Sequence, residues 1–138
     1  MNNDIKQVEE QKEEFKKEME EQREEVIKQL EEWNKNGFFE VNGRKYVLSK
    51  MTHQFRVEVL AIYSEIEILL LSGNYSFMIE DNFKKIIKKI EDRVLFDGMQ
   101  ISKRPQHWEE YEEDYIDFVT LSMKVICFPF YKKKLAIN

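Results

Sequence analysis

The chain has 138 residues, which is room for one domain of ordinary size or for a small domain with an appendage. Charged residues make up 36% and hydrophobic residues 42%, with 4 glycines and 2 prolines, so the composition suits a helix-rich protein and excludes collagen-like, linker-like and disulfide-scaffold classes. Aromatic residues reach 13%, which is too many for a disordered tail and requires a packed core.

Targeting and membrane segments are not expected. The N-terminus lacks a basic region followed by an apolar stretch, so it does not read as a secretory signal. The longest uncharged run, residues 68–79, is much shorter than the roughly 20 apolar residues of a membrane span. We therefore expect a soluble, cytoplasmic protein, and the single Cys127 fits a reducing compartment.

Charge is unevenly distributed along the chain. Residues 1–33 hold 12 acidic and 6 basic side chains, whereas the remaining 105 residues hold 15 acidic and 16 basic. The excess negative charge therefore belongs to one segment. This predicts an acidic helical arm over residues 1–36 and a nearly neutral helical body over residues 37–138, which opens with a β-hairpin.

The arm is predicted to be one long, coiled-coil-like helix. It contains no Gly or Pro before Gly37, and an alternating 3-4 spacing gives seven apolar residues in ten positions. About 33 helical residues make a rod of roughly 50 Å, longer than the roughly 35 Å diameter of a body of this size. Two interpretations stay open: a partner-binding or self-associating coiled coil, or a solvated helix. The partner-binding seam would consist of Ile5, Val8, Phe15, Met19 and Val26.

A β-hairpin follows the arm. Two alternating segments, 38–41 and 44–48, flank Asn42-Gly43, the dipeptide best suited to a two-residue type I′ turn. Because a two-stranded ribbon is marginal alone, it must lie on helices or add to another strand. The hairpin either covers the body or adds a strand to a partner, and the residues of such an addition would be Val41, Asn42, Gly43 and Tyr46.

Three helices are expected in the body. The first runs over 53–72, capped by Thr52 and ended by Gly73, and its apolar residues cover more than one face, as in a central helix. The second begins at Asp81 or Asn82, includes Val94 and closes at Asp97-Gly98. The third runs from Pro105 to near Cys127 and stops at residues 128–130.

The periodicity of these helices predicts the core. We expect thirteen side chains to be mostly buried: Phe55, Leu60, Tyr63, Ile66, Leu70, Phe83, Ile87, Ile90, Val94, Tyr115, Phe118, Val119 and Ile126. The fold class is therefore mainly α, with a long N-terminal helix, one hairpin and a compact body of three helices.

Residues with catalytic or metal-binding chemistry are few. His53, His107 and Cys127 are scattered, and a structural zinc site needs four well-spaced ligands. Cys127 lies between apolar neighbours and reads as a buried, inert thiol, while both histidines read as surface or capping residues. The chain also lacks a Gly-rich phosphate loop. We therefore expect no catalytic residue, no metal, no cofactor and no enzyme activity.

Two runs of charged residues are interpreted as solvent-exposed helix faces. The acidic run over residues 109–117 alternates with tyrosines on one helix, so it is interpreted as a solvated outer face. The lysines of residues 84–89 are interpreted as the polar face of their helix. Nucleic acid is not expected as a partner, because a body with a net charge of +1 lacks surplus positive charge.

The stretch Phe39-Glu40-Val41-Asn42-Gly43-Arg44-Lys45-Tyr46-Val47-Leu48 resembles the opening of tail-assembly chaperones and related baseplate-assembly proteins of tailed bacteriophages. These proteins often begin with such a hairpin and continue into helices, and the resemblance covers residues 38–131. It implies a non-enzymatic helper that binds the tape-measure protein in the host cytoplasm, and it carries over no site residues. A composition with 17 Lys, 13 Ile and 8 Asn against 2 Ala suggests an AT-rich genome, common in phages and many bacteria.

Two functions are therefore expected. The first is a phage tail-assembly or baseplate-assembly factor that binds the tape-measure or another tail protein during virion assembly. The alternative is a small coiled-coil adaptor or inhibitor of the phage–host conflict type, which self-associates through the arm and acts by protein–protein interaction.

Overall fold

The computed structural model describes residues 2–135. Within that range, nothing is described for the side chains of residues 2–5, 15, 19, 22, 23, 26, 34 and 132–135. The elements in chain order are α1 (Asn2–Asn36), β1 (Phe38–Val41), β2 (Arg44–Leu48), α2 (His53–Ser72), the 3-10 turn η1 (Ser76–Ile79), α3 (Asp81–Glu91), β3 (Val94–Phe96), β4 (Met99–Gln100), η2 (Ile101–Lys103), α4 (His107–Glu110), η3 (Glu112–Asp114) and α5 (Tyr115–Leu135). The mainly helical class is confirmed.

The sheet is larger than the single predicted hairpin. Four antiparallel strands lie in the order β1-β2-β3-β4, so β2 pairs with β3 through Val47 opposite Leu95 and Leu48 opposite Val94. The expected β1–β2 hairpin is confirmed with its turn type: Asn42 and Gly43 both have positive φ, 51° and 79°, as a type I′ turn requires. One face of it, Phe39, Val41, Tyr46 and Leu48, is buried.

A second hairpin replaces the end of the predicted second helix. Helix α3 ends at Glu91, and Asp97-Gly98 forms another two-residue turn, with φ of 50° and 79°, between Phe96 and Met99. The prediction that Asp97-Gly98 caps a helix was wrong. An Asp-Gly pair satisfies a helix end and a type I′ turn equally, and the free edge of β2 decides in favour of strands.

The predicted third helix is divided. Helix α4 ends at Glu110, Tyr111 leaves helical geometry (φ −123°, ψ 48°), and η3 leads into α5. The predicted stop at residues 128–130 was also wrong, because Pro129 lies inside α5. Proline at that position removes the hydrogen bond to Val125 but leaves the rest of the helix formed.

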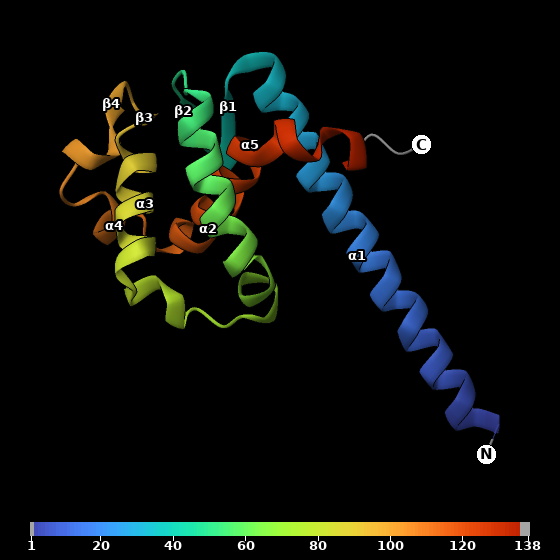
Figure 1. Cartoon of the computed structure of the whole chain (residues 1–138). Coiled ribbons are helices and arrows are strands. Elements are labelled where there is room, and N and C mark those ends of the chain that lie inside the picture. Colours follow the sequence, from blue (N-terminus) through green and yellow to red (C-terminus); the bar gives the residue numbers. More distant parts are fainter. Residues whose placement is uncertain (1, 136–138) are drawn as a thin grey trace.

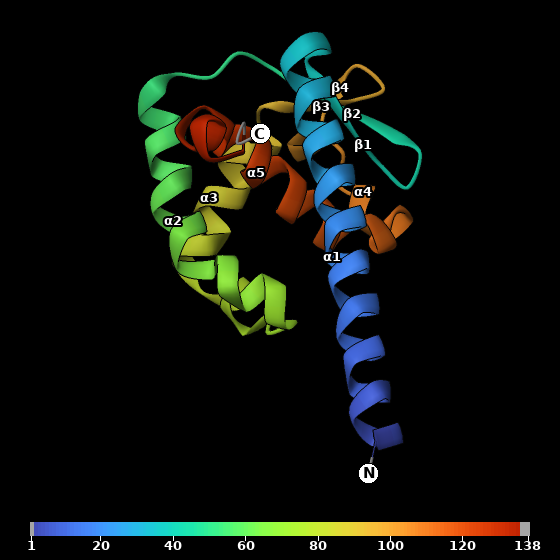
Figure 2. The same cartoon turned by 90° about the vertical axis from the view of Figure 1, so that its right-hand side faces the viewer.

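Helix α5 is the centre of the body. It packs against α1, α2 and β1 and is fully buried at Phe118, Val119, Met123, Val125 and Ile126. Figure 1 shows α2 and α3 side by side in front of it, with the sheet at one end of the body, and Figure 2 shows α5 between α2 and α1.

Helix α2 has the predicted bounds but not the predicted central place. Thr52 accepts a hydrogen bond from the Phe55 N–H at 3.1 Å, and Gly73 ends the helix with φ 75°. Only one face is buried, through Phe55, Val59, Tyr63 and Ile66.

The predicted core is largely confirmed. Ten of the thirteen side chains are buried, and Leu60, Leu70 and Tyr115 are half-buried. The core also takes in the hairpin face, and it includes Phe96 of β3 and Ile101 of η2.

Helix α1 contacts the body only near its C-terminal end. Leu30 is buried, Trp33 packs on the core and the Gln29 side chain accepts a hydrogen bond from the Glu40 N–H at 3.2 Å. Every described side chain from Lys6 to Glu25 is exposed. In both views the N-terminal part of α1 extends away from the body (Figures 1 and 2). Across residues 2–135, none of the helices combines the length and apolar character of a membrane span.

Candidate functional site

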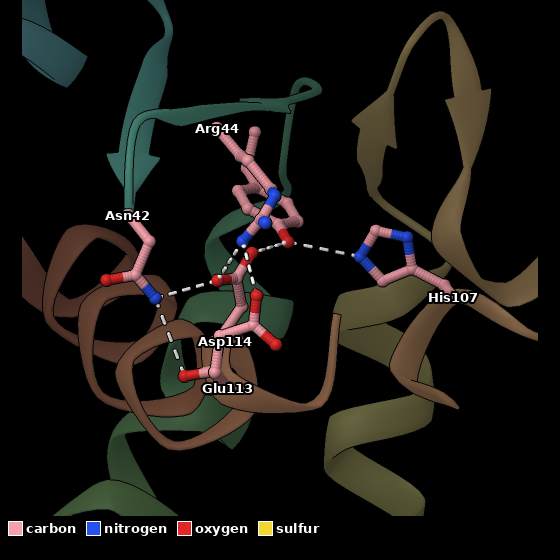
Figure 3. Close-up of polar contacts among 6 residues, drawn as sticks. Asn42, Arg44, His107, Glu113 and Asp114 are labelled. Carbon is pink, nitrogen blue, oxygen red and sulfur yellow. Dashed lines mark hydrogen bonds and ion pairs between the residues drawn. The ribbon is translucent and has the colours of Figure 1, made fainter. Parts of the chain in front are cut away.

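The densest group of polar side chains joins the first hairpin to the α4–η3 segment. Asn42 stands in the turn, Arg44 and Tyr46 lie on β2, and His107 and Asp114 come from about 60 to 70 residues further along the chain. Figure 3 shows Asn42 and Arg44 turned toward Asp114, with His107 on the other side of the group. We call Asn42, Arg44, Tyr46, His107 and Asp114 the polar cluster.

The carboxylate of Asp114 is the centre of this cluster and is 0% exposed. Its Oδ1 accepts hydrogen bonds from Asn42 Nδ2 at 2.8 Å and from an Arg44 guanidinium nitrogen at 2.7 Å. Its Oδ2 accepts from the Tyr46 hydroxyl at 2.8 Å. Arg44 also forms an ion pair with the exposed Glu113 at 3.0 Å. The buried charge is thus paired and hydrogen-bonded, the condition for stable burial.

A directed hydrogen-bond chain continues from Tyr46. Its single hydroxyl proton goes to Asp114, so the 3.1 Å contact with His107 requires Nε2–H of the imidazole as donor. Arg104 Nε donates to His107 Nδ1 at 3.3 Å, which fixes the same tautomer. Burial lowers the pKa of His107 below its ordinary value, and Arg104 adds to this, with Asp114 opposing. Burial, assisted by the bond to Asp114, raises the pKa of Tyr46.

Aromatic rings surround the ring of Tyr46 on the buried side of the cluster. The ring centroid of Tyr46 lies 5.7 Å from Phe39, 5.2 Å from Phe96, 5.3 Å from Phe118 and 6.5 Å from Trp108. These distances are typical of packed aromatic pairs. Asp114, Tyr46 and His107 therefore form the buried part of the cluster, and Asn42 and Arg44 connect it to the surface.

Two interpretations from the sequence were wrong here. Asp114 does not belong to a solvated face, although its neighbours Glu109, Glu110, Glu112 and Glu113 are exposed. His107 is buried at 2% exposure and is not a surface or capping residue. The missed signal was Tyr46: on the buried face of the hairpin its hydroxyl needs a buried partner.

The side chains of Cys127 and His53 lie as the sequence predicts, one buried and one exposed. Cys127 is buried, and burial raises the pKa of its thiol to about 12, which keeps it protonated and unreactive. His53 is exposed. Within the described part of the chain, no group of three or more His, Cys, Asp or Glu side chains is placed to hold a metal ion.

The predicted partner-binding residues fall into two sets. In the arm seam, Val8 is exposed, while the side chains of Ile5, Phe15, Met19 and Val26 lie outside the described part of the structure. In the hairpin, Val41 and Tyr46 are buried and Asn42 belongs to the polar cluster. The outward N–H of Glu40 on edge strand β1 is already bound by Gln29, which obstructs the addition of a strand there.

A groove runs between α1, the first hairpin turn and α5. It has a volume of about 420 Å³, its walls include the carboxylates of Glu25, Glu40 and Asp117, and its apolar floor includes Val41 and Leu121. The groove is open to solvent and lies outside the polar cluster, although Asn42 borders both.

Comparisons with protein-family models, with curated proteins and with solved structures find no match for this chain.

Proposed function

We propose that this protein is a non-enzymatic assembly factor that binds a partner protein through the N-terminal part of α1. From here on, the arm means this part, residues 2–26, without the docked end of the helix. The observation that supports this most directly is that Leu30 docks α1 on the body, whereas all described side chains over residues 6–25 are exposed. Val8, one of the seam residues, is 49% exposed. Apolar residues that repeat at heptad spacing on an uncovered helix favour a helical partner.

The rest of the molecule agrees with a binding role for the arm. The Asp114 carboxylate of the polar cluster is fully buried and already accepts three hydrogen bonds. The outer edge of β1 is occupied at Glu40 by the side chain of Gln29. The predicted seam lies on the arm, where Val8 is its one described side chain and is exposed, and a coiled coil with a partner helix is the interaction that the sequence of the arm favours.

The biological setting follows from the resemblance of residues 39–48 to phage tail-assembly chaperones. In that setting the partner is the tape-measure protein or another tail protein, bound in the host cytoplasm during virion assembly. The second candidate is a small adaptor or inhibitor of the phage–host conflict type, favoured if the seam pairs with a second copy of the chain. A tape-measure gene found immediately downstream of this one would support the first candidate, and its absence there would favour the second.

The test is a pair of full-length variants with the same change in net charge. Phe15→Glu combined with Met19→Glu places two charges in the seam, while Lys17→Glu makes the same change of two charges on the opposite side of the arm. Sedimentation of each, alone and mixed with the tape-measure protein of the same genome, gives the binding constant. We expect the seam variant to lose binding by at least about 100-fold, on the order of 3 kcal/mol, and the Lys17 variant to change it by less than about threefold.

Each outcome either identifies the kind of partner that the arm binds or rejects the proposal that the arm is a binding surface. Loss of a heteromeric complex alone supports the assembly factor, and loss of self-association alone supports the adaptor. If both variants bind every partner as the unmodified chain does and sediment as it does, the arm is a solvated helix and the proposal fails.

A further inference from the structure

Helix α2 is apolar on two faces, and the body covers only one of them. The inner face packs on α5 and α3. On the outer face, five exposed residues follow one another at spacings of four, three, four and three, which places them in one line along the helix. These residues, here called the α2 stripe, are Val57, Ala61, Ser64, Ile68 and Leu71.

The exposure of this stripe is unusual for a helix of such composition. Ile68 is 72% exposed and Leu71 is 74% exposed, among the highest values for large apolar side chains in the described residues. A helix that is apolar all round is normally buried on all sides. Figure 2 places α2 at the margin of the molecule, with α5 and α3 on its inner side. The exposure of the stripe residues shows that they lie on the outer side of the helix.

The stripe is complementary to itself when two copies run antiparallel. Core layers of an antiparallel helix pair then place small residues against large ones: Ala61 faces Leu71 of the other copy, and Ser64 faces Ile68. A parallel pair would set Ala61 against Ala61 and Ile68 against Ile68, which packs worse. The Ser64 hydroxyl already donates to the Ala61 carbonyl at 3.0 Å, so it enters such an interface without an unsatisfied donor.

We propose that the α2 stripe forms the interface of an antiparallel homodimer, with its two-fold axis at the level of residue 66. The contact is isologous and closes on itself, as in most soluble homodimers. Because α2 and the arm lie on opposite sides of α5, the dimer leaves both arms free. The inference concerns a surface distinct from the arm and does not depend on what the arm binds.

The strength of this dimer is limited by area and charge. A helix of 20 residues is about 30 Å long. Burying about a third of its side surface on each copy removes roughly 800 Å² in total, which is less than stable interfaces bury and falls in the range of weak, transient ones. Glu65 of one copy also lies close to Glu65 of the other, beside the two-fold axis, and the two like charges repel each other. We therefore expect a dissociation constant on the order of 10–100 µM.

Sedimentation equilibrium of two matched variants tests the surface. Ile68→Glu puts a charge in the centre of the stripe, whereas Ile79→Glu makes the same change at an isoleucine of similar exposure, 77%, outside α2. We expect the unmodified chain and Ile79→Glu to dimerise alike. Ile68→Glu should raise the dissociation constant of the dimer by at least about 30-fold, because it places a charge in an apolar contact. A chain that stays monomeric to about 1 mM, above the range expected for weak specific interfaces, or equal association of the two variants, overturns the proposal.

Spin labels at two exposed positions beside the stripe test the orientation. Glu65 and Ser72 are both exposed and lie outside the α2 stripe, and Cys127 is buried and does not compete for the label. With a 1.5 Å rise and helix axes 8–10 Å apart, the antiparallel dimer separates the two copies of residue 65 by about 10 Å and those of residue 72 by about 20 Å. Dipolar spectra of Glu65→Cys and Ser72→Cys should show these two separations. Equal short separations at both sites mean a parallel pair and overturn the antiparallel register.

Discussion

At the scale of single residues, Asp114 is the side chain on which most of the polar contacts converge. It accepts from Asn42, Arg44 and Tyr46 while fully buried, so it ties the first hairpin to the segment that precedes α5. Removing this acceptor leaves the buried Tyr46 hydroxyl and the partly buried Arg44 guanidinium without it, which costs more than the contacts themselves contribute.

Replacing Asp114 with Ala should therefore be strongly destabilising. We expect Asp114→Ala to lower the free energy of unfolding by about 3 kcal/mol, because it removes the acceptor of three donors. The exposed Glu112 of the same turn is the control, and Glu112→Ala should change the stability by less than about 0.5 kcal/mol. Urea unfolding measures both. Equal stability of the two variants would mean that the cluster does not hold the hairpin.

His107 makes the stability depend on pH in a defined direction. Its pKa is lowered in the folded state, so the unfolded chain binds more protons below the ordinary histidine value of 6.5. The stability it contributes is present above that pH and is lost as the pH falls toward the lowered pKa, by at most about 1.4 kcal/mol per pH unit.

The variant His107→Gln isolates this effect. A glutamine offers one donor and one acceptor to Tyr46 and Arg104 but does not titrate. We expect the free energy of unfolding to fall more steeply between pH 7.5 and 5.5 in the unmodified chain than in His107→Gln. Parallel curves would show that His107 is not protonated differently in the two states.

At the scale of elements, the helix ends and turns that depend on a few adjacent residues were predicted correctly from the sequence. The Thr52 and Gly73 ends of α2 and the Asn42-Gly43 turn are each determined by a few adjacent residues. Strand β3 was missed because Val94 continues the spacing of α3, and only the open edge of β2, far away in the chain, makes it a strand. Asp114 was missed for the same reason, since its partners lie about 70 residues earlier.

The second hairpin gives the third prediction. Gly98 has a φ of 79°, and no other atom lies within 4 Å of the position that a Cβ would occupy, so a side chain there meets only backbone strain. Gly98→Ala should destabilise the protein by about 1–2 kcal/mol. Gly98→Asn should cost clearly less, because asparagine tolerates left-handed geometry. Thermal unfolding compares the two variants, and an equal loss in both would point to a cause other than φ.

At the scale of the whole molecule, α5 organises the body and separates its two outward surfaces. The arm leaves the body on one side and the α2 stripe lies on the other, so a dimer through α2 would display two arms (Figure 2). Two linked arms bind a repeated or dimeric partner more tightly than one, through effective concentration alone. The proposed binding through the arm and the proposed dimer through α2 are therefore compatible, and together they would make the protein a bivalent binder. Each proposal concerns a different surface and can be tested without the other.

The place where the arm joins the body gives the final prediction. Leu30 is buried and Val8 is half-exposed on the same helix, so the structure divides α1 into a docked end and an extended end. Leu30→Ala should lower the free energy of unfolding by about 2–4 kcal/mol through the cavity it leaves, whereas Val8→Ala should change it by less than about 0.5 kcal/mol. Urea unfolding at low protein concentration keeps any association of the arm out of the comparison. Hydrogen exchange should agree: the amides near Leu30 share the protection of α5, and those near Val8 exchange as a frayed helix does. A cost at Val8 as large as that at Leu30 would mean that the whole of α1 folds against the body.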